Sequence, residues 1–378
     1  MRILVISPFN IFPPWWGGSS RIYNIIKYLS KNNEIIFLVN NHYCNKTLDN
    51  ESKELHDFKN NPNLKITYVK SFGRYSQIFN PLIIITGHKL IKNEKIDIIL
   101  GEFLWSGIHS ILLKYLTNRP FILDEHNIEY IRFGRINKKS KLITFIIRIY
   151  ESICCKFSNK IFCVSELDKK YLVNNLNIEK DKIIIVPNGI DTNKFYPNLS
   201  NTKLIRNKLD IDEIIPVILF FGKLDYYPNI EALEIIYKIL LPKLKNRIGK
   251  FKILIVGDNP PLNMQDLDII YTGVVEKIED YINVANIVIC PLLSGGGTRI
   301  KILESLACNK IVISTNIGAE GIKNIPPKQL RIADDWDIFV EEILKALKSK
   351  KYENGLKEIK KYSWEFIIKQ VEDALYDI

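Results

Sequence analysis

The segment from Ser294 to Glu304 combines residue types that bind anions with one that binds sugar hydroxyls. Its three consecutive glycines, Gly295–Gly297, let a backbone approach a ligand without obstruction by Cβ atoms. Thr298 is a good helix N-cap, and the free amides of the following turn would point at an anion. Arg299 and Lys301 add positive charge at the same helix end.

Glu304 lies six residues beyond Thr298, about 9 Å along a helix that rises about 1.5 Å per residue. A carboxylate at that distance from a phosphate cradle suits the hydroxyls of a ribose, so the segment predicts a nucleotide-diphosphate pocket. A simpler interpretation is a helix that caps itself with Thr298 and pairs Lys301 with Glu304. That interpretation does not account for three glycines in a row.

A strand and a helix must hold this segment in place. The apolar run Ile287–Ile289 predicts a buried strand, and Ile300, Leu303 and Ala307 recur at helical spacing. The expected local structure is therefore a strand, a glycine-rich turn and a helix.

The composition indicates a globular protein with two domains. The 378 residues are long for a single core, and 47% are hydrophobic and 25% charged. No apolar run approaches the roughly 18 residues that cross a bilayer, and Met1–Ser7 is too short for a signal-peptide core. We expect a cytoplasmic protein, either free or peripheral at the inner face of the membrane.

Charge and cysteine content leave the partner open. The formal net charge of +11 is compatible with nucleic acid, anionic lipid or an anionic substrate. The cysteines lack paired CxxC spacing, so buried thiols are expected rather than zinc ligands or disulfides. They are Cys44, Cys154, Cys155, Cys163, Cys290 and Cys308.

The first forty residues predict a parallel βαβ unit, with strands at Ile3–Ile6 and Ile35–Val39 and a helix between them. Gly17 and Gly18 at the start of that helix are a second candidate anion site. They do not form the GxGxxG fingerprint, and glycines that only make the turn are an equally good interpretation.

Two further strands, Ile96–Leu100 and Pro120–Leu123, follow, and the second leads into Asp124–Asn127. These polar residues are expected at the carboxyl ends of the strands, where open α/β sheets bind ligands. His126 would place a titratable group against a bound sugar. A lone histidine is more often an ordinary hydrogen-bonded residue, so both interpretations stay open.

The segment Lys138–Phe157 predicts a helix with a broad apolar side and a basic approach. It would either cover the sheet, as most such helices do, or lie on an anionic membrane surface.

The strand and helix alternation then ends and restarts. Asn188–Gly189 makes a turn, Pro197 begins a polar linker, and strands are expected at Val217–Phe221 and Ile311–Ser314. The predicted class is α/β, with two doubly wound, Rossmann-like domains facing across a cleft. The expected boundaries are 1–196, 197–360 and a closing helical segment, 361–378.

Taken in order, several motifs resemble the retaining, nucleotide-sugar-dependent glycosyltransferases of family 4, which have the GT-B fold. The motifs are Gly17-Gly18, the strand-end His126, VPNGIDTNKF, FFGKLDYYPN, TGVV near Gly273 and GGGTRIKILESLA. The resemblance implies that the second domain binds the nucleotide sugar, the first binds the acceptor, and the C-terminal helix crosses back to the first domain.

The resemblance also assigns roles to residues. Glu304 matches the family's ribose-binding glutamate, and the amides of Ile302 and Leu303 resemble the amides that bind the diphosphate. Lys223 stands where the family has a diphosphate-binding arginine. His126 matches the histidine beside the donor sugar. The family's earlier glutamate is replaced by Gly296, and a second lysine has no counterpart in the Tyr227–Asn229 region. We expect Arg299, with Lys301, to supply the missing charge.

The implied reaction is front-face glycosyl transfer to a hydroxyl of a glycan or lipid-linked acceptor, with retention and without a side-chain base. Transition-state stabilisation would come from charge on the leaving diphosphate. No divalent metal or other cofactor is expected, because no Asp-x-Asp pair stands at the glycine-rich segment. A sugar-nucleotide epimerase using Asp124 and Glu125 is the alternative within the fold. A non-catalytic basic-surface protein is the alternative outside it, although no RNA-binding motif occurs.

Overall fold

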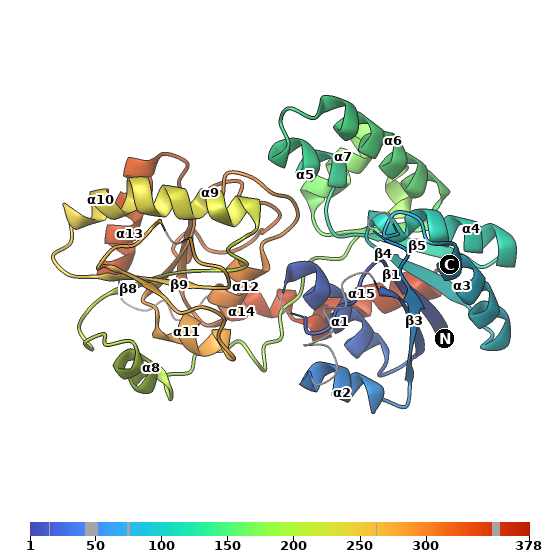
Figure 1. Ribbon diagram of the computed structural model, residues 1–378, viewed down its shortest axis with the longest axis horizontal. Helices are drawn as coiled ribbons and strands as arrows, with labels where there is room; N and C mark the ends of the chain where they lie inside the picture. The colour runs from blue at the N-terminus through green and yellow to red at the C-terminus, as the bar shows by residue number, and fades with distance from the viewer. Residues whose placement is uncertain (15, 42–51, 74–75, 262, 350–355) are drawn as a thin grey trace. The chain divides into compact units, whose positions relative to one another are not determined.

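The computed structural model describes residues 1–14, 16–41, 52–73, 76–261, 263–349 and 356–378. The chain divides into two compact units (Figure 1). Unit 1 comprises Met1–Asn188 and Trp364–Ile378, and unit 2 comprises Gly189–Ser363. Cys44 lies outside the described residues, whereas the other five cysteines are buried, as predicted.

Unit 1 is built on a seven-stranded parallel sheet with the order β3-β2-β1-β4-β5-β6-β7. The strands are β1 (Arg2–Ser7), β2 (Glu34–Asn41), β3 (Leu64–Lys70), β4 (Ile98–Glu102), β5 (Phe121–Glu125), β6 (Lys160–Cys163) and β7 (Ile183–Ile185). Their near-continuous apolar runs suit a sheet that is covered on both faces.

Two groups of helices cover that sheet. Helices α1 (Gly17–Leu29), α2 (Lys53–Lys59) and α15 (Trp364–Tyr376) share one core with the sheet. The other core includes α3 (Pro81–Asn93), α4 (Gly107–Thr117), α6 (Lys141–Phe157) and α7 (Glu166–Leu176). The remaining short elements are η1 (Leu104–Ser106), α5 (Glu129–Ile136) and η2 (Lys180–Lys182).

Unit 2 repeats the plan with a six-stranded parallel sheet in the order β10-β9-β8-β11-β12-β13. The strands are β8 (Val217–Phe221), β9 (Lys252–Val256), β10 (Ile269–Tyr271), β11 (Ile287–Cys290), β12 (Ile311–Ser314) and β13 (Leu330–Ile332). The helices are α8 (Thr202–Lys208), α9 (Tyr227–Ile235), η3 (Ile236–Leu240), α10 (Leu241–Lys245), α11 (Ile278–Val284), α12 (Ile300–Ala307), α13 (Trp336–Lys348), α14 (Leu356–Ile359) and η4 (Lys360–Tyr362).

The α/β class with two doubly wound units is thus confirmed. The units divide a few residues away from the expected boundaries at 196/197 and 360/361. The backbone shows why: the Ile190 amide donates to the Tyr362 carbonyl at 2.8 Å, and Ile190 forms a parallel bridge with Ser363. The chain therefore enters unit 2 directly after Asn188.

Helix α15 packs on α1 within unit 1 (Figure 1). Trp364 and Ile367 are buried in the core that α1 also lines, and the Tyr28 hydroxyl donates to Glu365 at 2.7 Å. These apolar and polar contacts fix the helix to the first half of the chain.

Candidate functional site

The predicted site residues gather at one point in each sheet. In unit 2 the strand order changes direction between β8 and β11, and in unit 1 between β1 and β4. Loops that leave adjacent strands at such a switch point run to opposite faces of the sheet and leave a ligand-binding crevice at the carboxyl ends. Lys223 and the glycine-rich loop follow β8 and β11, while Gly17 and Glu102 lie at the corresponding ends in unit 1.

The glycine-rich loop needs glycine at two of its positions. Gly295 has φ +111° and Gly297 φ +67°, in the region that side chains disfavour. A Cβ atom at Gly295 would also lie 2.9 Å from an Arg299 guanidinium nitrogen. Glycine there allows the arginine to fold over the loop.

The predicted Thr298 cap is wrong. Helix α12 begins at Ile300, and its N-cap is Arg299, which makes no side-chain cap bond. The Arg299 guanidinium donates to the carbonyls of Gly296 and Gly297. These bonds hold the loop next to an extended Arg299 (φ −81°, ψ 100°), so the helix starts two residues after Thr298, which is buried.

Lys301 occupies the centre of the unit 2 site. Its Nζ donates to Asn229 Oδ1 at 2.9 Å and lies 4.6 Å from the centre of the Phe220 ring. Burial lowers the pKa of Lys301 to about 8. A Cβ atom at Gly222, whose φ is +145°, would lie 2.9 Å from this ammonium. Gly222 therefore makes room for the cation beside the switch point.

Glu304 lies farther along α12, as the sequence predicted. Burial raises the pKa of Glu304 to about 7, although the charges of Lys194 and Lys301 act in the opposite direction. The alternative ion pair between Lys301 and Glu304 does not form, since the Lys301 ammonium bonds to Asn229. The neighbouring side chains of Ile302 and Leu303 are buried in the core. The Ile302 amide donates to the Arg299 carbonyl at 3.0 Å.

Lys223 extends from the end of β8 into solvent. Its Nζ lies 3.6 Å from an Asp225 carboxylate oxygen, and both side chains are largely exposed. The Lys223 carbonyl accepts a hydrogen bond from Asn229 at 2.7 Å. Asn229 thus holds both the backbone of Lys223 and the Lys301 ammonium.

The sequence analysis missed Asn229 as a site residue, and it also missed Glu231. The Ser294 hydroxyl donates to Glu231 Oε2 at 2.9 Å, so α9 brings a carboxylate to the glycine-rich loop. Their spacing in the sequence could have identified them. Asn229 and Glu231 follow Lys223 closely, and the first turns of α9 bring them back to the loop after β11.

In unit 1, His126 belongs to a buried charged network. His126 Nε2 lies 2.8 Å from Glu102 Oε2 and 3.4 Å from Asp124 Oδ2. The Arg21 guanidinium binds both Asp124 oxygens, at 2.7 and 2.9 Å. His126 is 5% exposed, and its Nδ1 has no hydrogen-bond partner among the described residues.

The network shifts the protonation of its members. Burial raises the pKa of Glu102 to about 7, and the charge of Asp124 adds to the effect. Burial opposes ionisation of Asp124 too, but Arg21 and His126 hold the pKa of Asp124 well below its usual range. Burial alone would lower the pKa of His126, whereas Asp124 and Glu102 raise it. The two carboxylates beside His126 Nε2 thus favour a proton on that nitrogen, directed at Glu102 and Asp124.

Aromatic rings connect this network to the two glycines at the start of α1. A Cβ atom at Gly18 would clash with the rings of Trp16 and Phe103. The Phe103 ring also lies against the His126 imidazole, with 3.7 Å between ring centres. Phe103 has φ +62°, an uncommon conformation for a non-glycine residue. The absence of a side chain at Gly18, in the first turn of α1, makes room for these rings.

Glu102, Asp124 and His126 have ligand atoms within 4.8 Å of one another, a spacing that a metal site could use. The Arg21 guanidinium, however, already occupies both oxygens of Asp124. A divalent ion at this position would lie close to the positive charge of Arg21. The residues that the structure describes offer no further carboxylate there to balance the two positive charges. The donor set therefore fits an internal ion-pair network better than a metal.

The two carboxylates considered for epimerase chemistry are also engaged. Arg21 binds Asp124, and the buried Glu125 accepts from the Cys155 thiol at 3.7 Å. Burial raises the pKa of Glu125 well above its ordinary value. Neither group is arranged as an open acid and base pair.

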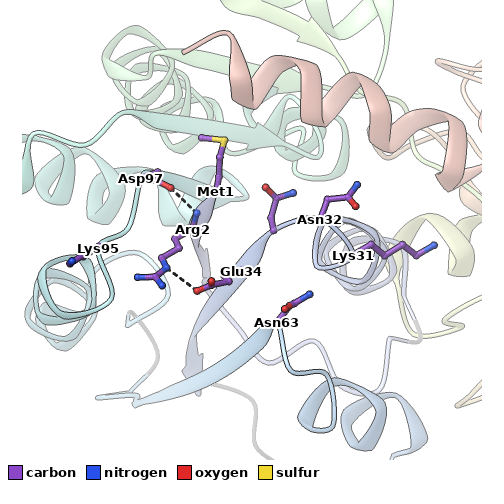
Figure 2. Close-up of a pocket in the computed structure, with 9 residues that line it drawn as sticks. Met1, Arg2, Lys31, Asn32, Glu34, Asn63, Lys95 and Asp97 are labelled. Carbon is purple, nitrogen blue, oxygen red and sulfur yellow. Dashed lines mark hydrogen bonds and ion pairs between the residues drawn. The ribbon is translucent and has the colours of Figure 1, made fainter.

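A polar cavity of about 540 Å³ lies at the opposite edge of the unit 1 sheet. Figure 2 shows Arg2 at its centre: the Arg2 amide donates to Asp97 at 2.8 Å, and its Nε pairs with Glu34 at 2.8 Å. This edge holds the amino ends of β1 and β2, and none of the predicted site residues lines the cavity.

Two Rossmann-like units, each with charged side chains at the switch point of its sheet, have the architecture of GT-B glycosyltransferases. Residues 16–194 match the family described as Glycosyltransferase Family 4, and residues 215–349 match Glycosyl transferases group 1. The chain belongs to this family and is a glycosyltransferase.

Individual proteins resemble the chain over most of its length. An Escherichia coli UDP-Gal:alpha-D-GlcNAc-diphosphoundecaprenol alpha-1,3-galactosyltransferase is 23% identical over 279 residues, 71% of this chain and 70% of the relative. Sucrose-phosphate synthase from Thermosynechococcus elongatus has a TM-score of 0.78 at 15% identity, covering 100% of this chain and 98% of that one. The Anabaena protein HepE, solved with UDP-glucose, has a TM-score of 0.75 at 13% identity and covers both chains completely.

Proposed function

We propose that the protein transfers a sugar, with retention of anomeric configuration, from a nucleotide-diphosphate sugar to a hydroxyl of a glycan or lipid-linked acceptor. The observation that carries the proposal is the arrangement at the unit 2 switch point. The glycine-rich loop and Arg299 lead into α12, which carries Lys301 and then Glu304, whose pKa is raised. Cations and amides would bind the diphosphate, and Glu304 the ribose.

The leaving group of this reaction is a nucleoside diphosphate, whose negative charge grows in the transition state. Lys301 and Lys223 would supply the compensating positive charge without a divalent metal. Because Arg299 bonds the carbonyls of the glycine loop, it would act by fixing the loop as well as by its charge. His126 would contact the donor sugar.

The proposed acceptor class follows from the relatives. The E. coli relative is named for a diphosphoundecaprenol-linked substrate, and a Streptococcus pneumoniae relative is named alpha-monoglucosyldiacylglycerol synthase. We infer synthesis of a cell-surface polysaccharide or glycoconjugate at the inner face of the membrane, with the protein bound peripherally to anionic lipid and independent of nucleic acid.

A thermal-shift screen of nucleotides and nucleotide sugars tests donor binding, because a ligand that binds only the folded state raises Tm. We expect one nucleotide diphosphate and its sugar conjugate to raise Tm, and Glu304→Ala to abolish the shift. NMR of the product made with that donor and a lipid-linked acceptor would then show the anomeric configuration. Full activity in EDTA is expected. Failure of every nucleotide to shift Tm would contradict the proposal.

A further inference from the structure

Helix α6 turns its apolar side toward solvent. The sequence favoured an apolar side that covers the sheet, but α6 buries a different face, formed by Ile147, Glu151, Cys154 and Cys155. Between 42% and 72% of each of seven large apolar residues remains exposed. They are Leu142, Ile143, Phe145, Ile146, Ile149, Ile153 and Phe157.

The exposed side continues onto the neighbouring helix, α4 (Figure 1). Tyr115 and Leu116 at the end of α4 are 64% and 57% exposed. The Tyr115 ring lies 6.2 Å from the Phe157 ring, and Lys114 donates to the Phe157 carbonyl at 2.9 Å. We call these two residues and the seven on α6 the α4–α6 surface, whose two parts meet where Tyr115 contacts Phe157. Monomeric soluble proteins rarely expose large apolar patches without a binding role.

The charges around this surface are of one sign. The acidic residue of α6, Glu151, is buried and accepts from the amides of Glu129 and Tyr130 at the start of α5. The exposed charged side chains of α6 and its approach are all basic: Lys138, Lys139, Lys141, Arg148 and Lys156. A second copy of this surface would meet it with like charges, whereas anionic headgroups would complement it.

We propose that the α4–α6 surface docks on a bilayer containing anionic lipid, with α6 lying in the plane of the interface. Its 17 residues span about 26 Å, short of the roughly 30 Å hydrocarbon core. No helix among the described residues is long and apolar enough to cross a membrane. A large apolar face flanked by lysines is the pattern of interfacial helices.

This inference rests on the proposed function only for its biological purpose, since a lipid-linked acceptor is presented at the membrane. Docking itself needs neither donor nor acceptor. It is therefore tested with vesicles alone, while donor binding is tested with nucleotides alone. If nucleotides fail but vesicles bind, the docking surface stands and the transferase proposal falls; the opposite pair of results overturns docking alone.

The test is flotation of the full chain with vesicles of phosphatidylcholine, with and without phosphatidylglycerol. We expect the protein to float with the anionic vesicles, and at least tenfold less binding to neutral ones or at high salt. The paired variant Ile146→Ser and Ile149→Ser should reduce anionic-vesicle binding at least tenfold. Lys138→Glu with Lys139→Glu should reduce it by a similar factor.

The control replaces two apolar residues in unit 2 that are even more exposed than Ile146 and Ile149. Ile214 and Leu267 are 87% and 91% exposed, so Ile214→Ser with Leu267→Ser should leave vesicle binding and Tm unchanged. Equal losses in the α6 and control variants would overturn the proposal. So would light scattering that shows a dimer which the Ile146→Ser and Ile149→Ser variant dissolves, because the surface would then be a contact between copies.

Discussion

Glu102 provides the sharpest test of how unit 1 serves the proposed reaction. Its Oε2 accepts the hydrogen bond from His126 Nε2 at 2.8 Å, and both side chains are buried. The bond selects the tautomer with the proton on Nε2, which leaves Nδ1 as the free ring nitrogen. Glu102→Gln keeps the shape and an acceptor oxygen but removes the charge that the carboxylate carries above its pKa of about 7, so the two enzymes are compared at pH 8.

The size of the effect follows from the change in bond type. A hydrogen bond to a charged group contributes about 1.5–3 kcal/mol and a neutral one about 0.5–1.5 kcal/mol. The difference, about 1–1.5 kcal/mol, corresponds to about a five- to tenfold lower kcat. Because Glu102 raises the pKa of His126, the limb of the pH profile that reports His126 should move to lower pH.

The control is the same substitution at Glu125, which lies next to His126 in sequence but bonds Cys155. Burial raises the pKa of Glu125 well above its usual value and so favours its neutral form, which Glu125→Gln imitates in shape and charge. Its kcat and pH profile should match those of the parent enzyme. The reasoning is refuted if Glu102→Gln keeps the parental kcat and pH limb, or if the two variants change alike while Tm falls in both.

Three further predictions concern unit 2. The folded-state pKa of Glu304 is raised to about 7, so its ionisation costs stability as pH rises; Glu304→Gln should raise Tm more at pH 8 than at pH 5, measured by calorimetry, while weakening donor binding. The pKa of Lys301 is lowered to about 8, so about half of its amines are neutral at pH 8. A nucleoside diphosphate that binds beside it should raise this pKa, and Lys301 should take up about half a proton, measured by calorimetry in buffers of different ionisation enthalpy. Binding to Lys301→Met should take up none. Gly222→Ala should lower Tm and donor affinity, by about 1–3 kcal/mol of backbone strain, whereas Gly249→Ala, where a Cβ atom meets nothing within 4 Å, should change neither.

Much of the fold could be predicted because buried parallel strands leave a strong mark in the sequence. β8 and β12 have their predicted bounds, since each is an apolar run that ends in a turn or polar residue. The start of α12 could not be predicted in the same way. Thr298 is a better N-cap than Arg299 by residue type, and only the folded loop shows Arg299 bonding the Gly296 carbonyl.

The unit 1 network was hidden for a different reason. Arg21 and Asp124 are 103 residues apart, and Arg21 lies within an otherwise ordinary amphipathic helix. His126 was found because it follows a strand, whereas its partner Glu102 ends the preceding strand and becomes its neighbour only when β4 pairs with β5. Contacts across a sheet depend on strand order, which a single sequence does not state.

The buried side of α6 was not predicted correctly for a third reason. Periodicity shows that a helix has an apolar side, but it does not show where that side points. Glu151, the most polar residue among those that α6 buries, finds amide partners at the start of α5 and can therefore face the core. Once a buried carboxylate is satisfied in this way, the apolar stripe can face outward. Helix α6 covers the sheet as predicted, but the sequence alone could not show which of its sides faces the core.

The switch points of the two units differ in their charge. The unit 2 switch point carries Lys223, Arg299 and Lys301, the sign that a departing diphosphate requires. At the unit 1 switch point two carboxylates, Glu102 and Asp124, lie beside His126, and the Arg21 guanidinium binds Asp124. In the proposed transfer, negative charge develops on the diphosphate and positive charge on the sugar ring. The cationic site of unit 2 matches the charge on the diphosphate, and reversing its sign should therefore slow transfer more than it weakens donor binding.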